Sequence, residues 1–294
     1  MHKWRQHIDH QIGFNQDKNL FYHGIPQAMK FSQSTLQAIR RLDDIPEKDL
    51  PLLMDYTTEK VLQGFCRINQ YFSFDENDKN DLKEIYRNLH RKITTKTIPL
   101  STIADNHYEN LKYWLLKTNP FSQKIYSESD AIVNAVACSE YSAQLQKRTL
   151  HLDRIKLSDP ILDIGCGKDG NLVKNLREEN LEAYGIDRFS DNSPFLKKAD
   201  WLEFDYGTEK WGTIVSNLGF SNHFVHHHLR NDGAYIEYAK KFMDILRSLK
   251  IGGCFCYAPD LPFIEQFLNE TNFQITKYGI DNLSFNATII TRLI

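Results

Sequence analysis

Hydrophobic residues in the first half of the chain recur at helical spacing. Between residues 45 and 150, apolar side chains fall three or four positions apart, which places them on one face of a helix. Four helices are predicted from stripes at Val61, Phe65, Ile68 and Phe72; at Leu82, Ile85 and Leu89; at Leu111, Trp114 and Leu115; and at Val133, Val136, Ala137 and Tyr141. Ser101 is the predicted N-cap of the third helix, Asn119-Pro120 breaks the chain, and the fourth helix is expected over 130–148. The more polar residues 1–44 are expected to be partly helical.

The pattern changes near residue 159, where short apolar runs alternate with amphipathic stretches. The apolar runs are ILDIG, EAYGID, WGTIVSN and GCFCYAP. Such alternation predicts a parallel sheet with helices on both faces. Two further strands, FQITKYGI and SFNATIITRLI, are joined by only a few residues around Asp281-Asn282, which permits an antiparallel hairpin but not a parallel crossover. We therefore expect a mostly helical domain over 1–150 and an α/β domain over 151–294.

A glycine-rich turn links the first strand of the α/β domain to its first helix. Glycines 165, 167 and 170 fit the spacing G-x-G-x-x-G, and Asp187 ends the next strand, where an acid can meet ribose hydroxyls. That pattern alone is also compatible with NAD. Three features argue against NAD: the acid Asp163 would repel a pyrophosphate and attract a cation, a hairpin replaces a second mononucleotide-binding half, and the whole unit takes only about 135 residues.

Several motifs of this region occur in a characteristic order over about 155–294. They are ILDIGCG, GID, the AD of KKADWLEF, TIVSNLGF, LKIGGCF and the terminal hairpin. Together they resemble the class I S-adenosylmethionine-dependent methyltransferases. The resemblance implies a methyltransferase with S-adenosyl-L-methionine as cofactor, and a Rossmann-like seven-stranded sheet whose last strand is antiparallel. Only thirteen positions separate Asp187 from Asp200, where the family usually fits a helix and a strand, so we expect a very short or missing helix and a weak third strand.

The resemblance also implies roles around the cofactor. Asp163 would lie near its ammonium, Asp187 would accept from both ribose hydroxyls, and Asp200 would accept from the adenine amino group. The glycine turn would contribute Gly165, Cys166 and Gly167, and the end of the fourth strand would contribute Ser216, Asn217 and Leu218. Arg188 and Trp201 would lie beside the adenine. Arg148, on the helix before the first strand, would also contact the cofactor.

Four histidines follow the fourth strand, beside the place where an acceptor meets the methyl group in this class. On a helix, His223, His226 and His227 share a face, and three imidazoles can hold zinc. No H-E-x-x-H motif or cysteine cluster accompanies them, so we expect no metal and interpret His227 and His228 as the start of a surface helix. His223 and His226 are candidates for a catalytic base, because the pKa of imidazole lies near neutrality.

Charge and composition limit the chemical class of the methyl acceptor. Residues 1–150 carry 20 basic and 18 acidic side chains, and residues 151–294 carry 16 and 20, so neither half is polybasic. The loop after the fourth strand also lacks an N-P-P-Y type signature. We therefore favour a small-molecule or peptide acceptor, with an RNA methyltransferase and a non-catalytic cofactor-binding scaffold as alternatives.

In enzymes of the class that the chain resembles, an added helical domain covers the acceptor pocket, sets specificity or forms a homodimer, and the resemblance implies one of these roles for residues 1–150. The five cysteines are few and odd in number, the start has no signal-like apolar core, and no run of about 18 apolar residues occurs. A cytoplasmic protein with reduced thiols and no membrane span is expected.

Overall fold

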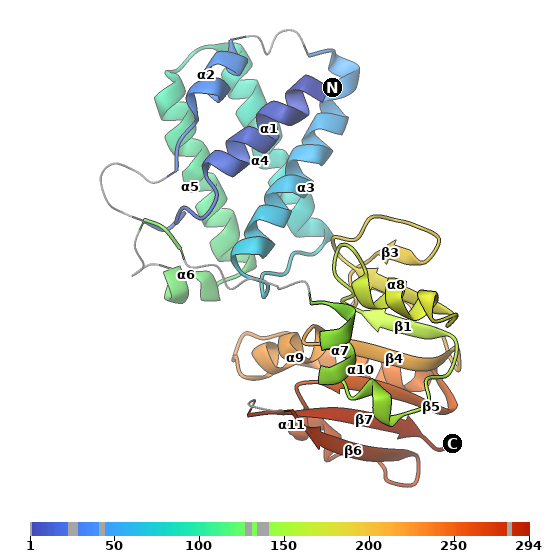
Figure 1. Cartoon of the computed structure of the whole chain (residues 1–294). Helices are drawn as coiled ribbons and strands as arrows, with labels where there is room; N and C mark the ends of the chain where they lie inside the picture. The colour runs from blue at the N-terminus through green and yellow to red at the C-terminus, as the bar shows by residue number, and fades with distance from the viewer. Residues whose placement is uncertain (1, 23–28, 41–44, 127–130, 134–140, 281–283) are drawn as a thin grey trace. The chain divides into compact units, whose positions relative to one another are not determined.

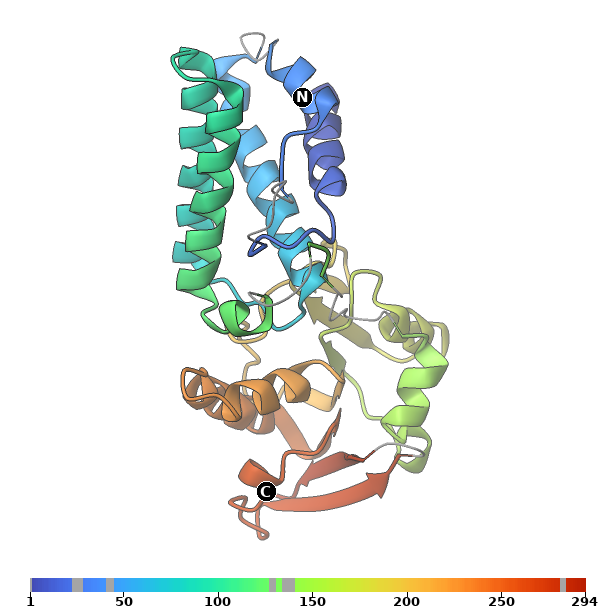
Figure 2. The same cartoon turned by 90° about the vertical axis from the view of Figure 1, so that its left-hand side faces the viewer.

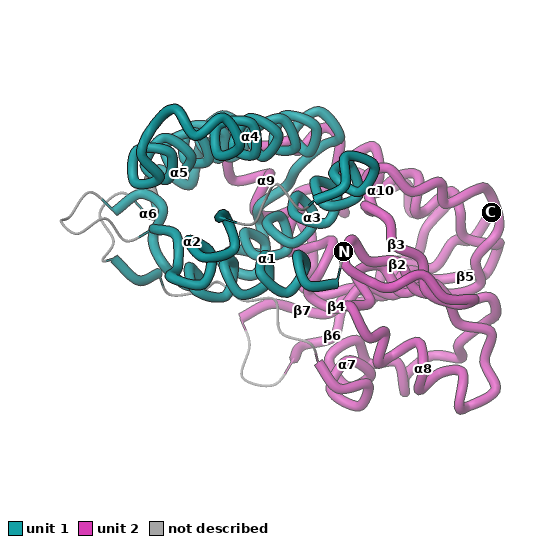
Figure 3. Tube along the Cα trace, turned by 90° about the horizontal axis from the view of Figure 1, so that it is seen from above, with its two compact units in different colours: residues 1–138 teal, residues 139–294 magenta. Residues whose placement is uncertain are grey.

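The computed structural model describes residues 2–22, 29–40, 45–126, 131–133, 141–280 and 284–294 (Figure 1). The chain forms two compact units, Met1–Cys138 and Ser139–Ile294 (Figure 3). The division lies before the predicted boundary at residue 150, because helix α7 (Ala143–Thr149) packs on α8 (Asn171–Glu178) in the second unit.

The first unit is helical. Its elements are α1 (His2–Phe14), α2 (Gln33–Ile39), the 3-10 helix η2 (Glu47–Asp49), α3 (Leu50–Ile68), α4 (Glu76–Thr95), α5 (Leu100–Thr118) and α6 (Phe121–Tyr126). Helix α4 packs against both α3 and α5 (Figure 2). The predicted stripes meet in the core, where the rings of Phe74 and Trp114 stack 4.9 Å apart and Phe65 lies against both. The first three predicted helices, and partial helix before residue 45, are confirmed.

Three details of the helical prediction are wrong. Helix α5 begins at Leu100 with Pro99 as its N-cap, so Ser101 lies inside the first turn. Phe72 is buried but lies beyond the end of α3, because the chain turns at Asn69, whose side chain accepts a hydrogen bond from a backbone N–H two residues later. In place of a helix over 130–148, Ile132 forms a bridge with Lys18 and the helix is the shorter α7; Val136 and Ala137 lie outside the described residues.

The second unit contains one seven-stranded sheet. Its strands are β1 (Ile161–Ile164), β2 (Ala183–Asp187), β3 (Leu196–Lys198), β4 (Trp211–Asn217), β5 (Leu249–Ala258), β6 (Phe273–Gly279) and β7 (Asn286–Arg292), in the order β3-β2-β1-β4-β5-β7-β6. Strand β7 is antiparallel to both of its neighbours, β5 and β6, as predicted, and the other strand pairs of this sheet are parallel. The link around Asp281-Asn282 lies outside the described residues.

Helices cover both faces of this sheet. The layer with α7 and α8 packs on one face, and α9 (Phe220–His228), α10 (Tyr235–Ser248) and the short α11 (Pro262–Glu265) pack on the other (Figure 2). A 3-10 helix, η3 (Leu152–Arg154), precedes β1. Strands β1 and β4 are buried along their whole length because both faces are covered. Their carboxyl ends therefore meet the end of β2 at one edge of the sheet, where ligands bind in open α/β folds.

The connection from β2 to β3 contains no helix over residues 188–195, all of which are described, and β3 has three residues. This confirms the missing helix and the weak third strand, which follow from Pro194 and the polar sequence around it. The cysteines in the described part of the chain are all buried, and none of them forms a disulfide: Cys66, Cys166, Cys254 and Cys256. None of the helices in the described ranges is long and apolar enough to cross a membrane.

Candidate functional site

The glycine turn after β1 has a conformation that glycine favours. Gly165 and Gly167 have φ of 77° and 75°, in the left-handed region. The N–H groups of Gly165 and Cys166 both donate to the Ile186 carbonyl, at 2.9 and 3.1 Å, which holds the turn against the end of β2. A Cβ on Gly165 would lie 3.1 Å from the ring of Trp201. The turn therefore presents bare backbone between the ends of β1 and β2.

Asp163 is a buried acid without a donor. Its side chain lies at the end of β1 and is 1% exposed, and neither carboxyl oxygen has a hydrogen-bond partner among the described residues. Burial, and then the charge of Asp187, raise the pKa of Asp163 to about 8. A buried acceptor without a partner costs about 1–3 kcal/mol or more. The site therefore favours a ligand that brings a cation or hydrogen-bond donors.

Asp187 and Asp200 add two further carboxylates to this edge. Asp187 ends β2; its Oδ1 accepts the Phe189 N–H at 2.8 Å and its Oδ2 accepts the Gly167 N–H at 3.3 Å. Burial nevertheless raises the pKa of Asp187, and the charge of Asp200 adds to the rise. Asp200 accepts the Leu202 N–H at 2.8 Å. Neighbouring carboxylates repel one another, and a cationic ligand relieves that repulsion.

The end of β4 supplies a second unpartnered acceptor. Asn217 is 9% exposed, and its side-chain oxygen has no partner among the described residues. Asp163 pairs in register with Val215, so Asn217 lies two residues further along the neighbouring strand, on the same face of the sheet. Asp163 and Asn217 therefore direct unsatisfied oxygens to the same side of this edge.

The two residues beside Asn217 serve the fold. The Ser216 hydroxyl donates to the Ile164 carbonyl at 2.9 Å and accepts the Phe220 N–H at 3.1 Å, tying β1 to the start of α9. Leu218 has φ of 55° and its N–H donates to the Ala258 carbonyl. Of Ser216, Asn217 and Leu218, Asn217 is therefore the residue whose side-chain oxygen is available to a ligand.

The remaining predicted contacts fall in different places. Trp201 lies against Gly165, and Arg188 stands 5.0 Å from the centre of the Phe189 ring. Cys166 is buried in the α8 layer, and a Cβ on Gly185 would lie 2.7 Å from its sulfur, so glycine is needed there. Arg148 is exposed in the last turn of α7.

The two candidate bases on α9 differ in environment. His223 is buried, its ring meets the Trp201 ring at 80° with centroids 4.8 Å apart, and its Nδ1 lies 3.5 Å from the Tyr238 hydroxyl. Burial lowers the pKa of His223 well below its ordinary value. His226 is half-buried; the Arg230 guanidinium donates to its Nε2 at 3.0 Å. Burial, with the charge of Arg230, lowers the pKa of His226 to about 4.

The other two histidines are engaged in packing. The His227 Nδ1 accepts the Ala234 N–H at 3.1 Å, and the His228 ring stacks on Phe263 at 3.8 Å. A metal ligand must offer a free ring lone pair, so a metal bound by His226 and His227 through these nitrogens would break two hydrogen bonds. In the described part of the chain, no group of three His, Cys, Asp or Glu side chains has a metal-binding arrangement.

Sequence reasoning missed one residue that shapes this site. Tyr238 on α10 accepts from the Trp201 indole N–H at 3.4 Å, stacks on His227 at 4.8 Å and lies beside His223. Its only sequence signal is membership of the apolar stripe of α10, which does not distinguish it from an ordinary core residue.

No protein-family profile matches the sequence, and no curated protein matches it. Half of the chain is similar to solved structures of three proteins. These are a TehB-like SAM-dependent methyltransferase from Corynebacterium glutamicum (16% identity, TM-score 0.36, 50% of this chain and 87% of that chain), an rRNA methylase from Streptococcus thermophilus (17%, 0.34, 50% and 98%) and a SAM-dependent methyltransferase from Bacteroides fragilis in complex with S-adenosyl-L-homocysteine (13%, 0.36, 51% and 81%). These identities are too low to extend a neighbour's activity or substrate to this chain. The strand order and the antiparallel β7 give the second unit the class I methyltransferase fold that its motifs predict.

Proposed function

We propose that residues 139–294 form an S-adenosylmethionine-dependent methyltransferase domain. The observation that carries the proposal is Asp163, a buried carboxyl without a partner beside a bare glycine turn. S-adenosylmethionine fits this edge because it is cationic at both its ammonium and its sulfonium and has no phosphate. Asp163 and Asn217 offer acceptors for the ammonium, Asp187 for the ribose hydroxyls, and Asp200 for the adenine amino group.

The protein's own groups would bind the cofactor and align the acceptor with its methyl group, and they would not need to activate the cofactor. When bound, the cofactor supplies an electrophilic methyl on a good, neutral leaving group. The backbone of Gly165 and Gly167 admits it at close range, and Trp201 limits its position from the other side of the turn. Catalysis would then come chiefly from holding an acceptor lone pair in line with the methyl, an effect of orientation. A hydroxyl or protonated amine would also need a base.

We propose a small molecule or peptide as acceptor. The segment that follows β4 and enters α9 reads LGFSN, without an N-P-P-Y type clamp for a base, and the chain has no excess of basic residues. The test is transfer of a labelled methyl group into a native cell extract, with small molecules, peptides and nucleic acids separated afterwards. Label in RNA, together with steeply salt-dependent RNA binding, would favour the alternative acceptor. Tight cofactor binding with no labelled product would favour a scaffold.

Cofactor binding is expected to release protons near neutral pH. The free protein holds Asp163 largely protonated, because its pKa is about 8, whereas a bound ammonium favours the carboxylate. Up to about one proton should leave per S-adenosylhomocysteine bound at pH 7, and affinity should rise from pH 6 to 8. Calorimetry in two buffers of different ionisation enthalpy measures the released protons. Proton uptake, or affinity that falls over this range, would contradict a cation beside Asp163.

Alanine substitutions of the two candidate bases are expected to have different effects. His223→Ala should lower the unfolding free energy by about 2–4 kcal/mol, since it leaves a cavity behind Trp201, and should weaken cofactor binding by loosening that ring. His226→Ala should leave cofactor affinity unchanged. A base role for His226 would appear as a fall in kcat of about a hundredfold or more. Urea unfolding, calorimetry and turnover on the same preparations distinguish these effects, and unaltered turnover in His226→Ala would remove it as the base.

A further inference from the structure

Tyr238 brings a buried hydroxyl into a group of phenylalanine rings where α10 packs on α9. The residue is 2% exposed, and its ring centre lies 5.5 Å from that of Phe220 and 5.7 Å from that of Phe224. Phenylalanine would fill this space equally well, whereas a buried hydroxyl costs free energy unless it has a hydrogen-bond partner. The hydroxyl of Tyr238, rather than its ring, therefore calls for an explanation.

This hydroxyl meets the indole ring of Trp201. The Trp201 Nε1–H donates to it at 3.4 Å, and the Nδ1 of His223 lies 3.5 Å from the same oxygen. An indole N–H can only donate, so the oxygen accepts this bond and the hydroxyl proton is left for His223. Burial raises the pKa of Tyr238, which keeps that proton on the oxygen at neutral pH. One hydroxyl thus links α10 to Trp201 and to α9.

The far edge of the indole lies against backbone at the ends of β1 and β4. A Cβ on Gly165 would lie 3.1 Å from the Trp201 Cζ3, and a Cβ on Gly219 would lie 3.7 Å from the same atom. Gly165 belongs to the glycine turn, and Gly219 precedes α9, two residues after Asn217. The position of the ring therefore affects how closely a ligand can approach both segments.

Two further contacts restrict Trp201. The His223 ring meets the indole at 80° with centroids 4.8 Å apart, and the Tyr206 hydroxyl donates to the Trp201 backbone carbonyl at 3.0 Å. Ordering a side chain at the moment of binding costs free energy, so a ring that is already held when the ligand arrives favours binding. The contact with Tyr238 fixes the nitrogen end of the indole, opposite the end that faces the glycines.

We infer that Tyr238 is a positioning residue of the candidate cofactor site, whose hydroxyl holds the Trp201 ring where it meets the glycine turn and the start of α9. Tyr238 acts through the indole and does not itself have to touch the ligand. The inference rests on the proposed function, because it assigns a role at the same site. The position of the ring, however, can be measured without a ligand.

Tyr238→Phe removes the hydroxyl, keeps the ring and tests the inference in the whole chain. In ¹⁵N-labelled protein each of the four tryptophans gives one indole N–H signal, and Trp201→Phe identifies the signal of Trp201. We expect Tyr238→Phe to move that signal upfield in the proton dimension, because the indole loses its acceptor. Calorimetry should show S-adenosylhomocysteine binding about fivefold more weakly, the effect of one neutral hydrogen bond.

A double variant separates action through Trp201 from a general loss of packing. If Tyr238 acts through the indole, Trp201→Phe/Tyr238→Phe should bind S-adenosylhomocysteine no more weakly than Trp201→Phe alone. Tyr257→Phe is the matched control, because it also removes a buried hydroxyl, one that donates to Glu265 at 2.5 Å. It should lower the unfolding free energy while leaving the Trp201 signal and the affinity unchanged. Circular dichroism checks that each variant folds.

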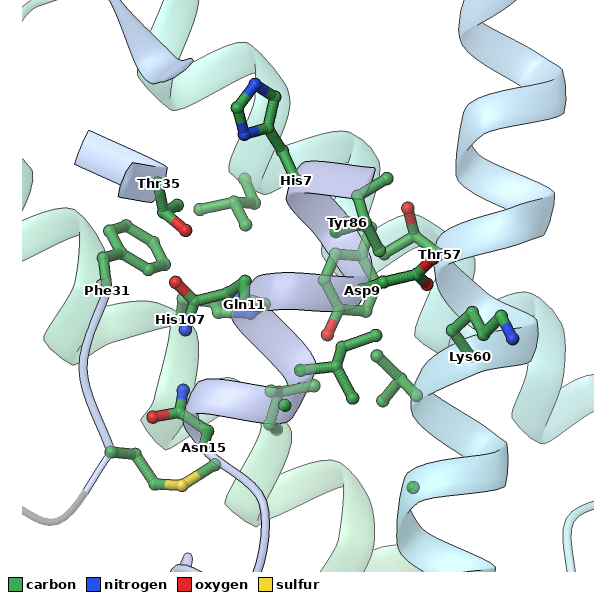
Figure 4. A pocket seen from close by; sticks show the side chains of 18 of the residues that line it. His7, Asp9, Gln11, Asn15, Phe31, Thr35, Thr57, Lys60, Tyr86 and His107 are labelled. Carbon is green, nitrogen blue, oxygen red and sulfur yellow. The ribbon is translucent and has the colours of Figure 1, made fainter. Parts of the chain in front are cut away.

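A titration of the wild-type protein gives a measurement that does not depend on any variant's folding. Trp4 lines a pocket of the helical unit together with residues of α3 and α5 (Figure 4). S-adenosylhomocysteine bound at the glycine turn should move the Trp201 signal and leave the Trp4 signal in place. Movement of the Trp4 signal alone would place the ligand in the helical unit and overturn the inference.

The other outcomes distinguish the inference from the proposal on which it rests. An unmoved Trp201 signal in Tyr238→Phe, or affinity losses that add in the double variant, would remove the role of Tyr238. The same holds if Asp187→Ala loses affinity while Tyr238→Phe binds as tightly as wild type. Wild-type protein that bound no S-adenosylhomocysteine would overturn the proposed function itself, and this inference with it.

Discussion

Asp163→Asn is expected to weaken cofactor binding by about a hundredfold or more and, at the same time, to make the free protein more stable at neutral pH. The loss follows because an amide cannot offer the charge that an ammonium prefers, and hydrogen bonds to charged groups contribute about 1.5–3 kcal/mol each. The gain in stability follows because Asn does not titrate, whereas Asp163 is an acid that is buried without a partner. Few single substitutions would affect binding and stability in opposite directions.

The sign and range of the stability change follow from the pKa of Asp163. Its value is about 8 in the folded protein and about 3.9 in the unfolded chain. A group with a raised folded pKa gives its full stability below the unfolded value and loses it as pH rises toward the folded value. Between pH 4 and 7 the loss is about 4 kcal/mol, at 1.4 kcal/mol per unit. Asp163→Asn has no carboxyl at this position and does not lose this stability, so the difference in unfolding free energy between the variant and wild type should grow from pH 5 to 8.

Urea unfolding at pH 5, 7 and 8 and calorimetry with S-adenosylhomocysteine measure the two effects. Asp153→Asn is the matched control, because Asp153 is an exposed acid in η3, the 3-10 helix that precedes β1. It should change neither quantity appreciably. A variant at Asp163 that lost stability at pH 8 would mean that the carboxylate has a partner in the folded protein, and the argument for a cationic ligand would fail.

The fold of the second unit was predictable because its signals are local. Alternating apolar runs identify the strands, Pro194 and a polar sequence predict the missing helix, and the short link near Asp281 requires a hairpin. The start of α7 was not predictable, because the apolar stripe over 130–148 has helical spacing whether or not those residues form a helix in the folded chain. At Ile132 a bridge to Lys18 takes precedence over that local pattern.

The candidate site was only half predictable for a similar reason. Motif spacing identifies Asp163, Asp187 and the glycine turn, because these positions follow strand ends. Which polar atoms are already satisfied depends on contacts between distant segments. Ser216 is engaged by Ile164, across 52 positions, while Asn217 beside it keeps a spare oxygen. The exposure of α1 is equally hidden from the sequence, because Trp4, Ile8 and Ile12 form a stripe like that of an ordinary buried face, whereas no residue of α1 is buried.

Asp187→Ala is expected to reduce cofactor affinity by at least about a hundredfold. Two charge-assisted hydrogen bonds to ribose hydroxyls contribute about 3 kcal/mol or more, and each 1.4 kcal/mol is a factor of ten. The same carboxylate accepts the Gly167 N–H at 3.3 Å and the Phe189 N–H at 2.8 Å, so alanine also frees the glycine turn. Both effects weaken binding. Calorimetry with S-adenosylhomocysteine gives the affinity of the variant.

A matched control separates the ribose contact from a general effect of charge. Asp191 is an exposed acid in the same connection after β2, and Asp191→Ala should leave affinity within about twofold of wild type because exposed charges are screened by solvent. Asp187→Asn keeps an oxygen able to accept the Phe189 N–H but carries no charge. Its affinity should fall between those of wild type and Asp187→Ala. Undiminished binding in Asp187→Ala, with Asp163→Asn still defective, would mean that the ligand of this edge is a cation without ribose hydroxyls at β2, and S-adenosylmethionine would no longer fit the site.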